Sequence, residues 1–228
     1  MLKRFFHRDN ASVLTHDGAL ARIAQKQLEI ATIIDVGAAK GAWTEKAWRH
    51  WPQANAHLLE AKESWRPDIE NLRKKHGRVS YKIAGAARTP GKIYFPKDVD
   101  EYGGAVFKES SERANLEEID ATSIDHEVAQ FGLKGPYAIK LDTHGTEVDI
   151  LDGATRALEE TAFLCIETYS MIGQKRFPEL IADLQGRGFR CADVAEPLFR
   201  PRDKLLWQID FYFLRADHPA FRDYKYLP

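Results

Sequence analysis

Short runs of β-branched and aliphatic residues alternate along the chain with amphipathic stretches. Residues 31–36 (ATIIDV) are apolar, β-branched and followed by a glycine, a pattern that predicts a buried strand. Residues 43–51 follow with apolar positions at helical spacing and end at Pro52. Residues 54–59 predict a second strand. Residues 67–76 then predict a helix, because proline occupies its first turn.

The same alternation continues to the end of the chain. Further strands are predicted at residues 79–87, 136–142, 163–167, 189–194 and 206–214. Apolar residues three and four apart predict helices over residues 148–158 and 177–187. Residues 93–96 predict a short extra strand or hairpin arm. Residues 97–118 are polar and contain glycine, and they are a candidate lid.

Strands that alternate with helices favour a parallel sheet covered by helices on both faces. The last two strands have no helix between them, so an antiparallel hairpin should end the sheet. We therefore predict an α/β, Rossmann-like fold with about seven strands, mostly parallel. No repeat, low-complexity tract or linker divides the sequence, which predicts a single domain over residues 1–228. Residues 1–29 would form an N-terminal extension and helix, and residues 30–214 the core.

Composition narrows the classes of function. Hydrophobic residues make up 44% of the 228 positions and charged residues 29%, which is typical of a globular protein. The net charge of -1 disfavours nucleic acid as a partner. No apolar run approaches the roughly 20 residues of a membrane helix, and the basic start lacks the apolar segment of a secretory signal. Cys165 and Cys191 are expected to be free thiols, so the expected location is the cytoplasm.

The turn from the first strand into the first helix carries a candidate ligand site. Gly37 and Gly41 allow the backbone to bend tightly and a ligand to approach it. The free N–H groups of the new helix would face the same crevice. A dinucleotide site would need Gly-x-Gly-x-x-Gly, whereas here Asp35 precedes the first glycine by two residues. A carboxylate suits an ammonium and a sulfonium, so Asp35, Gly37, Ala38 and Gly41 are predicted to contact the methionine end of S-adenosylmethionine.

Two later segments would complete the nucleoside site. Glu60 ends the second strand, about 20 residues after the glycine turn, where an acid accepts hydrogen bonds from ribose hydroxyls in Rossmann-like sheets. Gly85 and Ala86 follow the third strand and would lie beside adenine.

A third group would carry the chemistry. Asp142 ends the fourth core strand, His144 follows it, and Glu167 ends the fifth strand. Their side chains should meet beyond the carboxyl ends of the strands, where ligands sit in open α/β sheets. His144 is the candidate general base for a hydroxyl acceptor. Asp142 and Glu167 could hold Mg²⁺, but they could equally bind sugar hydroxyls or shape the field around the sulfonium. We assign no metal ligand.

Residues 196–210 are dense in both charged and aromatic side chains. This segment either helps to bind an anionic or carbohydrate acceptor or forms an exposed turn between two strands.

Three segments resemble the FkbM family of S-adenosylmethionine-dependent methyltransferases. Residues 34–41 (IDVGAAKG) are similar to hydrophobic-Asp-Val-Gly-Ala-Asn-x-Gly, with Ala39 in place of Asn. Residues 139–147 (IKLDTHGTE), followed by Leu151 and Gly153, are similar to Lys-Ile-Asp-Val-Glu-Gly-x-Glu…Leu-x-Gly. Residues 164–167 match the acid-ended fifth strand.

The resemblance covers about residues 30 to 214. It implies O-methylation of a sugar, a glycolipid or another small molecule. His144 stands where the family commonly has Glu, so the family's role for that position does not transfer directly.

Two other functions remain open from the sequence. A nicotinamide-dependent oxidoreductase could use a similar sheet, although the missing third glycine and Asp35 argue against it. A non-catalytic nucleoside- or carbohydrate-binding domain could retain the crevice without the chemistry. An RNA methyltransferase is disfavoured by the net charge.

Overall fold

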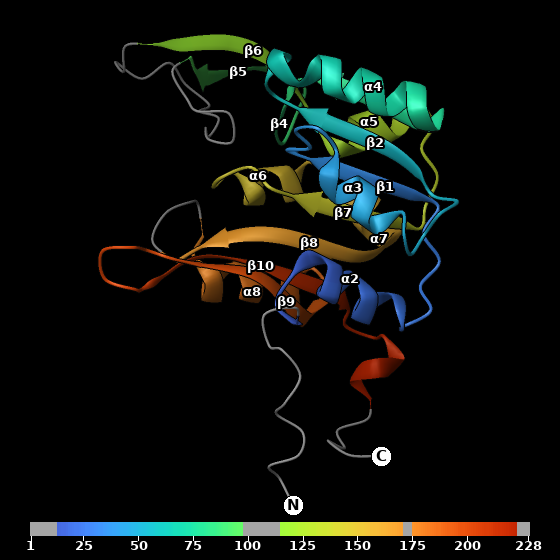
Figure 1. The fold of residues 1–228 in the computed structure, drawn as a ribbon, viewed down its shortest axis with the longest axis vertical. Coiled ribbons are helices and arrows are strands. Elements are labelled where there is room, and N and C mark those ends of the chain that lie inside the picture. The colour runs from blue at the N-terminus through green and yellow to red at the C-terminus, as the bar shows by residue number, and fades with distance from the viewer. Residues whose placement is uncertain (1–12, 98–114, 171–174, 223–228) are drawn as a thin grey trace, which may run out of the picture.

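The computed structural model describes residues 13–97, 115–170 and 175–222, and a seven-stranded sheet lies at its centre (Figure 1). The strand order is β3-β2-β1-β7-β8-β10-β9. The bounds are Thr32–Val36 (β1), Asn55–Glu60 (β2), Val79–Ile83 (β3), Tyr137–Leu141 (β7), Thr161–Tyr169 (β8), Phe189–Phe199 (β9) and Leu206–Arg215 (β10). The β10 strand runs antiparallel to both of its neighbours, and the other strand pairs of this sheet are parallel. The predicted mixed sheet with a C-terminal hairpin is confirmed.

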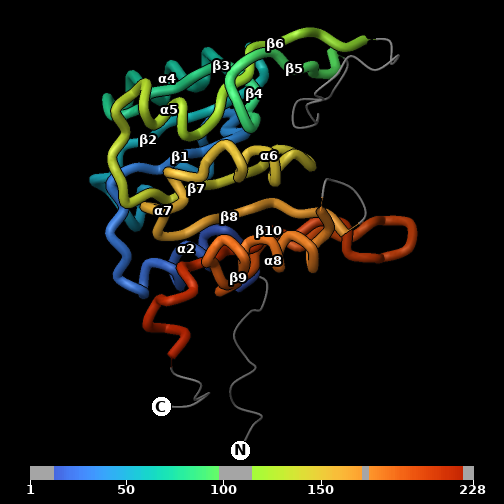
Figure 2. The backbone as a smooth tube through the Cα atoms, turned by 180° about the vertical axis from the view of Figure 1, so that it is seen from behind, coloured from blue at the N-terminus to red at the C-terminus, as the bar shows by residue number. Residues whose placement is uncertain are grey.

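Helices cover both faces of the sheet, as the front and rear views show (Figures 1 and 2). One face packs against α2 (His16–Ala24), α3 (Ala42–Ala47) and α4 (Arg66–His76). The other face packs against α5 (Ile124–Phe131), α6 (Glu147–Asp152), α7 (Thr155–Glu159) and α8 (Phe177–Gly186). Short 3₁₀ turns lie at Glu63–Trp65 and Pro219–Phe221. Within the described ranges, no helix has both the length and the apolar character needed to cross a bilayer.

The strands are apolar on both sides because both sides are covered. Successive side chains of a strand point to opposite faces. Ile33 accordingly packs on the α2 and α3 side, whereas Ile34 packs on the α5 to α8 side. Every residue of β1 is buried.

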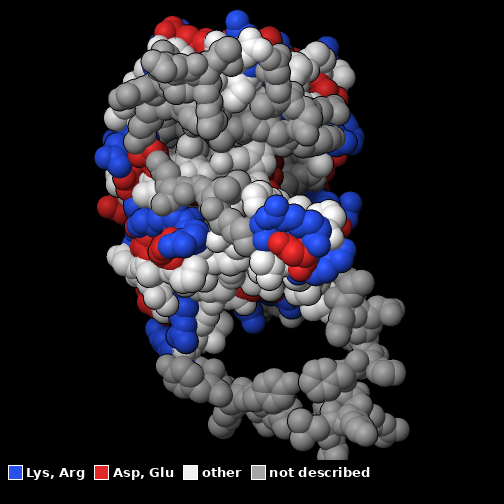
Figure 3. Space-filling view, turned by 90° about the vertical axis from the view of Figure 1, so that its left-hand side faces the viewer, with Lys and Arg blue, Asp and Glu red and all other residues white. Residues whose placement is uncertain are grey.

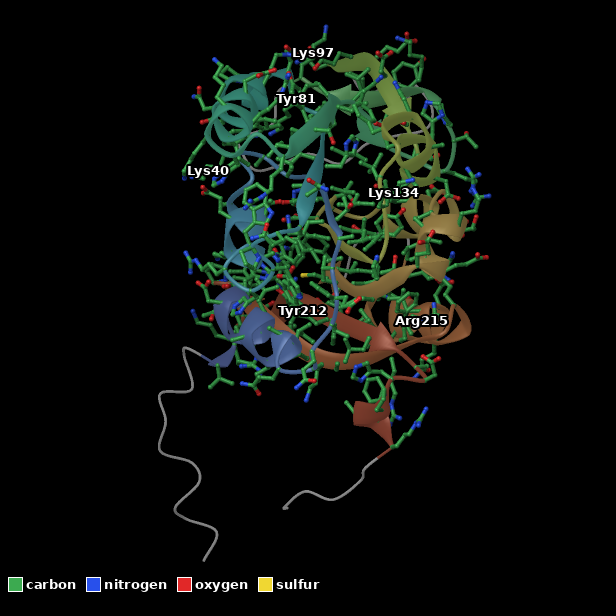
Figure 4. All side chains as sticks on the ribbon, turned by 90° about the vertical axis from the view of Figure 1, so that its right-hand side faces the viewer. Lys40, Tyr81, Lys97, Lys134, Tyr212 and Arg215 are labelled. Atoms are coloured by element: carbon green, nitrogen blue, oxygen red, sulfur yellow. The ribbon has the colours of Figure 1, made fainter. Side chains whose placement is uncertain are left out.

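The helix before the first strand is fixed to the sheet through Tyr212, a fully buried residue of β10 (Figure 4). The Tyr212 hydroxyl lies 2.8 Å from Nδ1 of His16 in α2. It also accepts a hydrogen bond of 3.2 Å from Nε1 of Trp43 in α3. The first and last parts of the described chain therefore meet in one buried cluster.

A second, three-stranded sheet alters two of the predictions and confirms a third. It consists of β4 (Gly85–Ala86), β6 (Leu116–Thr122) and β5 (Gly91–Pro96), in the order β4-β6-β5. The strand predicted over residues 79–87 divides into β3 and β4, because Gly85 leaves the main sheet and pairs with Ala121. The extra strand near residues 93–96 is confirmed. Residues 116–118 of the candidate lid belong to β6, and residues 98–114 lie outside the described part of the chain.

Two helices differ from the predicted pattern. The helix predicted over residues 148–158 divides into α6 and α7 around Gly153. A Cβ atom at Gly153 would lie 2.6 Å from the carbonyl oxygen of Ala87, so this backbone packs directly on the segment after β4. The α5 helix was not predicted, although Ser123 caps its first turn and Gly132, with φ +59°, ends it.

A buried pair of side chains joins β2 to α5. Nε2 of His57 lies 3.1 Å from a carboxylate oxygen of Glu127, and the Thr122 hydroxyl donates a hydrogen bond to the other oxygen. His57 is 0% exposed and Glu127 is 1% exposed. Burial by itself would raise the pKa of Glu127, but the hydrogen bonds from His57 and Thr122 outweigh it and lower the pKa below its usual value.

We expect Glu127→Gln to destabilise the protein at neutral pH by about 1–3 kcal/mol, because it removes an ionised acceptor from a buried network. A carboxyl whose pKa is lower in the folded state stabilises the protein above its unfolded pKa of about 4.3, and that stabilisation is lost as the pH falls. The difference in the free energy of unfolding between the wild type and the variant should therefore become smaller at acidic pH. Urea unfolding at neutral pH and near pH 4 measures it, with the exposed Glu29→Gln as the control. A difference that is equal at both pH values would contradict the assignment.

Candidate functional site

A cavity of about 340 Å³ opens beyond the carboxyl ends of the parallel strands. The chain proceeds from β1 to β2 and β3 on one side, and β7 and β8 lie on the other side of β1. Such a reversal of strand order leaves a crevice where ligands bind in open α/β sheets. The cavity volume lies within the range of about 300–1,000 Å³ that is usual for small-molecule sites.

Gly37 forms the floor of this crevice at the end of β1. Its φ is +71°, and its N–H donates a hydrogen bond of 2.9 Å to the carbonyl oxygen of Leu59. A Cβ atom at Gly37 would lie 2.0 Å from the carbonyl oxygen of Asp142. Only glycine fits at this position. Gly41, with φ +78°, has a different role, because a Cβ there would lie 2.5 Å from Cδ2 of Leu72 and would disturb packing behind the cavity.

Lys140 links two carboxylates beneath the cavity. Its Nζ lies 3.5 Å from Oδ1 of Asp35 and 3.0 Å from Oδ2 of Asp142, and it donates a hydrogen bond of 3.3 Å to the carbonyl oxygen of Gly37. Burial alone would lower the pKa of Lys140, but Asp142 and Asp35 outweigh burial and the pKa is raised. Burial raises the pKa of Asp142 and Lys140 lowers it, with a net lowering. Lys140 therefore remains a cation.

Asp35 lies behind the wall of the cavity. It is 0% exposed, and Oδ2 accepts a hydrogen bond of 2.7 Å from the Thr44 hydroxyl of α3. Burial raises the pKa of this carboxyl. Its side chain points to the α3 face of the sheet because Asp35 shares the parity of Ile33 along β1.

Glu60 holds together the two strand-end loops beside the cavity. One carboxylate oxygen accepts a hydrogen bond of 2.7 Å from the N–H of Ala39, and the other accepts one of 2.9 Å from the N–H of Lys62. Glu60 lines the cavity although it is only 7% exposed, and burial raises its pKa.

His144 lies at the other side of the cavity in a network with Glu167 and Tyr169. Nδ1 of His144 is 3.0 Å from Oε2 of Glu167 and 2.5 Å from the Tyr169 hydroxyl oxygen. The Tyr169 hydroxyl donates a hydrogen bond of 2.8 Å to the same Glu167 oxygen. The Tyr169 oxygen therefore accepts from His144, which assigns the proton of a neutral imidazole to Nδ1. The Gln208 amide donates to the second Glu167 oxygen, and burial raises the pKa of Glu167.

The loop that carries His144 is held by Glu147. Its Oε1 accepts hydrogen bonds of 2.7 Å from the N–H of Gly145 and 3.3 Å from the Thr143 hydroxyl. His144 adopts φ +57°, a left-handed conformation that a side chain rarely takes without such support. The neighbouring Thr146 hydroxyl is buried and has no hydrogen-bond partner among the described residues. Thr146 lines the cavity, so a bound ligand would supply that partner.

The structure brings most of the predicted site residues together. Those that line the cavity are Gly37, Glu60, Gly85, Ala86, Asp142, His144 and Glu167. Asp35, Ala38 and Gly41 are not among the lining residues, and all three support the turn from behind. Lys140 and Thr146 were not predicted as site residues, and Gln208 was included only within the candidate acceptor-binding segment, residues 196–210. Lys140 could have been noticed as a charged residue in the middle of an apolar strand, whereas nothing local in the sequence distinguishes Gln208.

Residues 35–191 match the family model described as the methyltransferase FkbM domain. The chain belongs to the FkbM methyltransferase family. This match confirms the resemblance found in the sequence. Among proteins with curated descriptions, none matches this chain.

Solved methyltransferase structures with a similar fold share little sequence with this FkbM protein. A Burkholderia thailandensis 1,6-didemethyltoxoflavin-N1-methyltransferase with bound S-adenosylhomocysteine is 14% identical, with a TM-score of 0.49 over 89% of this chain and 78% of that chain. An rRNA methylase from Streptococcus thermophilus is 12% identical, with a TM-score of 0.47 over 86% and 93%. The N-methyltransferase NodS from Bradyrhizobium japonicum is 10% identical, with a TM-score of 0.48 over 88% and 94%.

The cofactor of this family, S-adenosylmethionine, fits the cavity. Three lining residues are acidic, Glu60, Asp142 and Glu167, against one lysine, Lys62. A sulfonium and an ammonium suit this balance, whereas a pyrophosphate would meet like charge. The glycine floor and the unpartnered Thr146 hydroxyl are further features that a nucleoside ligand would use.

Asp142, His144 and Glu167 also have the residue types of a metal site, and one ligand atom from each lies within 4.8 Å of the others. These atoms already have protein partners, since Asp142 pairs with Lys140 while His144 and Glu167 pair with each other. We assign no metal to them.

Gly37→Ala should abolish measurable binding of S-adenosylmethionine and lower the free energy of unfolding by more than about 2 kcal/mol, because the new Cβ meets a backbone oxygen and φ is positive. Gly77→Ala is the matched control. Its φ is +66°, but a Cβ there meets nothing within 4 Å. The control should lose about 1 kcal/mol of stability and keep its affinity. Calorimetry measures the affinity and urea unfolding measures the stability of each variant. Equal losses of affinity and stability in the two variants would refute the steric argument.

Lys140→Met should destabilise the protein by about 3–5 kcal/mol, because it leaves two carboxylates without the cation between them. The exposed Lys26→Met is the control and should change stability by less than about 0.5 kcal/mol. Urea unfolding compares them. A loss of stability as small as that of the control would show that the ion pairs of Lys140 contribute little to the free energy of unfolding.

Proposed function

We propose that this FkbM protein transfers a methyl group from S-adenosylmethionine to a hydroxyl group of a sugar, a glycolipid or another small molecule. The observation that carries this proposal is the histidine–glutamate pair, His144 and Glu167, on the wall of the cavity whose floor is Gly37. A hydroxyl group needs a base when it becomes a nucleophile, and a histidine held by a carboxylate is suited to that role.

Four of the lining residues would hold the cofactor. The backbone at Gly37 lies at the glycine turn, Glu60 offers carboxylate oxygens to ribose hydroxyls, and Gly85 and Ala86 leave room for the base. When bound, S-adenosylmethionine supplies a methyl group on a positively charged sulfur. We assign supporting roles to Asp35, Ala38 and Gly41, which shape the turn without lining the cavity.

His144 would move the acceptor proton. With the proton of the neutral ring on Nδ1, the nitrogen that takes the hydroxyl proton is Nε2. The carboxylate of Glu167 holds the ring in this tautomer and stabilises the imidazolium that forms, while Tyr169 and Gln208 fix the carboxylate. Asp142, already paired with Lys140, would accept a hydrogen bond from the acceptor and so orient it.

Alignment of the reactants and proton transfer contribute differently to the rate. Fixing two reactants in one geometry can lower a barrier by about 7–11 kcal/mol. A general base typically adds about 10²–10⁴-fold in rate. The cavity residues should therefore contribute more by positioning than by proton transfer.

The charge distribution supports a small acceptor. Figure 3 faces the edge of the sheet at which the cavity opens, and lysine, arginine and acidic residues are interspersed on the described surface there. A nucleic-acid surface usually has one continuous basic patch. We infer that the acceptor is a small molecule or a carbohydrate.

Calorimetry with S-adenosylmethionine, S-adenosylhomocysteine and NAD tests the class of ligand. We expect binding of the first two and none of NAD, because NAD brings a pyrophosphate to an acidic cavity. NAD binding would favour the oxidoreductase alternative. Cofactor binding without methyl transfer to a broad panel of hydroxyl acceptors would favour a non-catalytic binding domain.

His144→Gln should retain affinity for S-adenosylmethionine and reduce kcat by about 10²–10⁴-fold, because glutamine is polar but cannot take a proton. Release of S-adenosylhomocysteine with an acceptor from the panel measures turnover. The exposed His126→Gln, on α5, is the control and should be unaffected. Unchanged turnover in His144→Gln would remove the base role.

A further inference from the structure

The β9–β10 hairpin carries exposed apolar side chains on both sides of a charged turn, residues 200–204. Leu198, Phe199 and Leu205 are each about half exposed, at 52%, 52% and 51%. The other large hydrophobic side chains exposed among the described residues, Val13, Leu14 and Phe131, are at 39% each. An apolar cluster of this kind on a protein surface usually marks an interaction site.

A second cavity lies on this hairpin. Its volume is about 680 Å³, and its lining is Leu198, Phe199, Arg200, Pro201, Arg202 and Trp207. We call it the hairpin cavity. Its volume is within the range of small-molecule sites, and four of its lining residues are apolar or aromatic, as such sites usually are.

The hairpin cavity lies next to the cavity that His144 and Glu167 line, because Trp207 lines the first and Gln208, the following residue, lines the second. The ring of Trp207 packs edge-on against the ring of Tyr169, with 5.9 Å between centroids, and Tyr169 contacts His144. The hairpin projects from the edge of the sheet at which β8 ends (Figure 1). One molecule could thus lie in both cavities.

The charged residues at the rim of the hairpin cavity further restrict the class of ligand that it can bind. Arg200 is paired with Asp203 at 2.6 Å, whereas the Arg202 side chain is 75% exposed and lies 3.4 Å from the same carboxylate. The rim therefore carries two arginines against one acid. It suits a neutral or anionic ligand and disfavours a cationic one.

A second copy of the chain is a poorer occupant. Three half-exposed side chains offer on the order of 300 Å² of apolar surface, against about 800 Å² per partner in a stable protein interface.

We propose that the hairpin cavity binds the apolar part, an alkyl chain or an aromatic group, of the acceptor whose hydroxyl reaches His144. The acceptor is then an amphiphile, neutral or anionic, rather than a free sugar. This inference rests on the proposed hydroxyl methylation for its orientation, but its test depends on binding alone.

The test uses glucose and its butyl, hexyl and octyl β-glycosides as probes, below their micelle concentrations and with S-adenosylhomocysteine present. Calorimetry on the wild-type chain should show affinity that rises with chain length. Full burial of each methylene would give up to about fourfold, so at least about tenfold is expected from butyl to octyl. Equal affinity for all four probes would overturn the proposal.

The double variant Leu198→Ser with Phe199→Ser should lose the chain-length dependence. Phe131→Ser is the matched control, since it replaces an exposed phenylalanine on α5 and should keep the dependence. His144→Gln should also keep it. If the wild-type chain shows the chain-length dependence but methylates none of a broad panel of hydroxyl acceptors, the proposed function is refuted and the hairpin cavity remains a binding site.

Two other results would overturn the proposal in favour of a different occupant. The first is a dimer, detected by light scattering, that the double hairpin variant abolishes. The second is binding to phosphatidylcholine vesicles through the same two side chains with no dependence on glycoside chain length.

Discussion

The site depends on one buried cation held between two carboxylates. Lys140 of β7 reaches Asp35 of β1 across the point where the strand order reverses, and it reaches Asp142 at the end of its own strand. The same ammonium group also holds the carbonyl oxygen of Gly37. Lys140 therefore contacts both the glycine floor, at Gly37, and one acid of the cavity wall, Asp142. Without Lys140, two carboxylates would face each other in a medium where an unpaired charge is strongly unfavourable.

Much of this arrangement could be predicted because the pattern that creates it is local. Apolar runs that end at glycine or at an acid gave the main strands, and their order along the chain gave the parallel core and the final hairpin. The small second sheet could not be predicted in the same way, because the pairing of Gly85 with Ala121 joins segments that are far apart in the sequence. The end of a predicted strand shows where a side chain lies along the sheet. The face on which a side chain lies depends on the alternation along the strand, and Asp35 faces α3 together with Lys140, its register partner in β7. Asp142 follows the last residue of β7 and lines the cavity.

The surroundings of His144 illustrate the same limit. Its place after the fourth core strand could be read from the sequence, and so could Glu167 at the end of the next strand. The partners that fix the glutamate could not, because Gln208 reaches it only through the register between β8 and β10. The family commonly has Glu where this chain has His144. In this chain an imidazole lies at that position against the carboxylate of Glu167.

The reversed direction of β10 has a consequence for how this enzyme can diversify. Parallel strands deliver only their final residues to the crevice, whereas a strand that runs the other way delivers its first ones, so the loop before it emerges beside the reacting groups. That loop can grow, shrink or change composition while β1, β2 and β3, on the other side of the crevice, keep their pairing. A single protruding arm can therefore change the surroundings of the crevice without rebuilding the sheet.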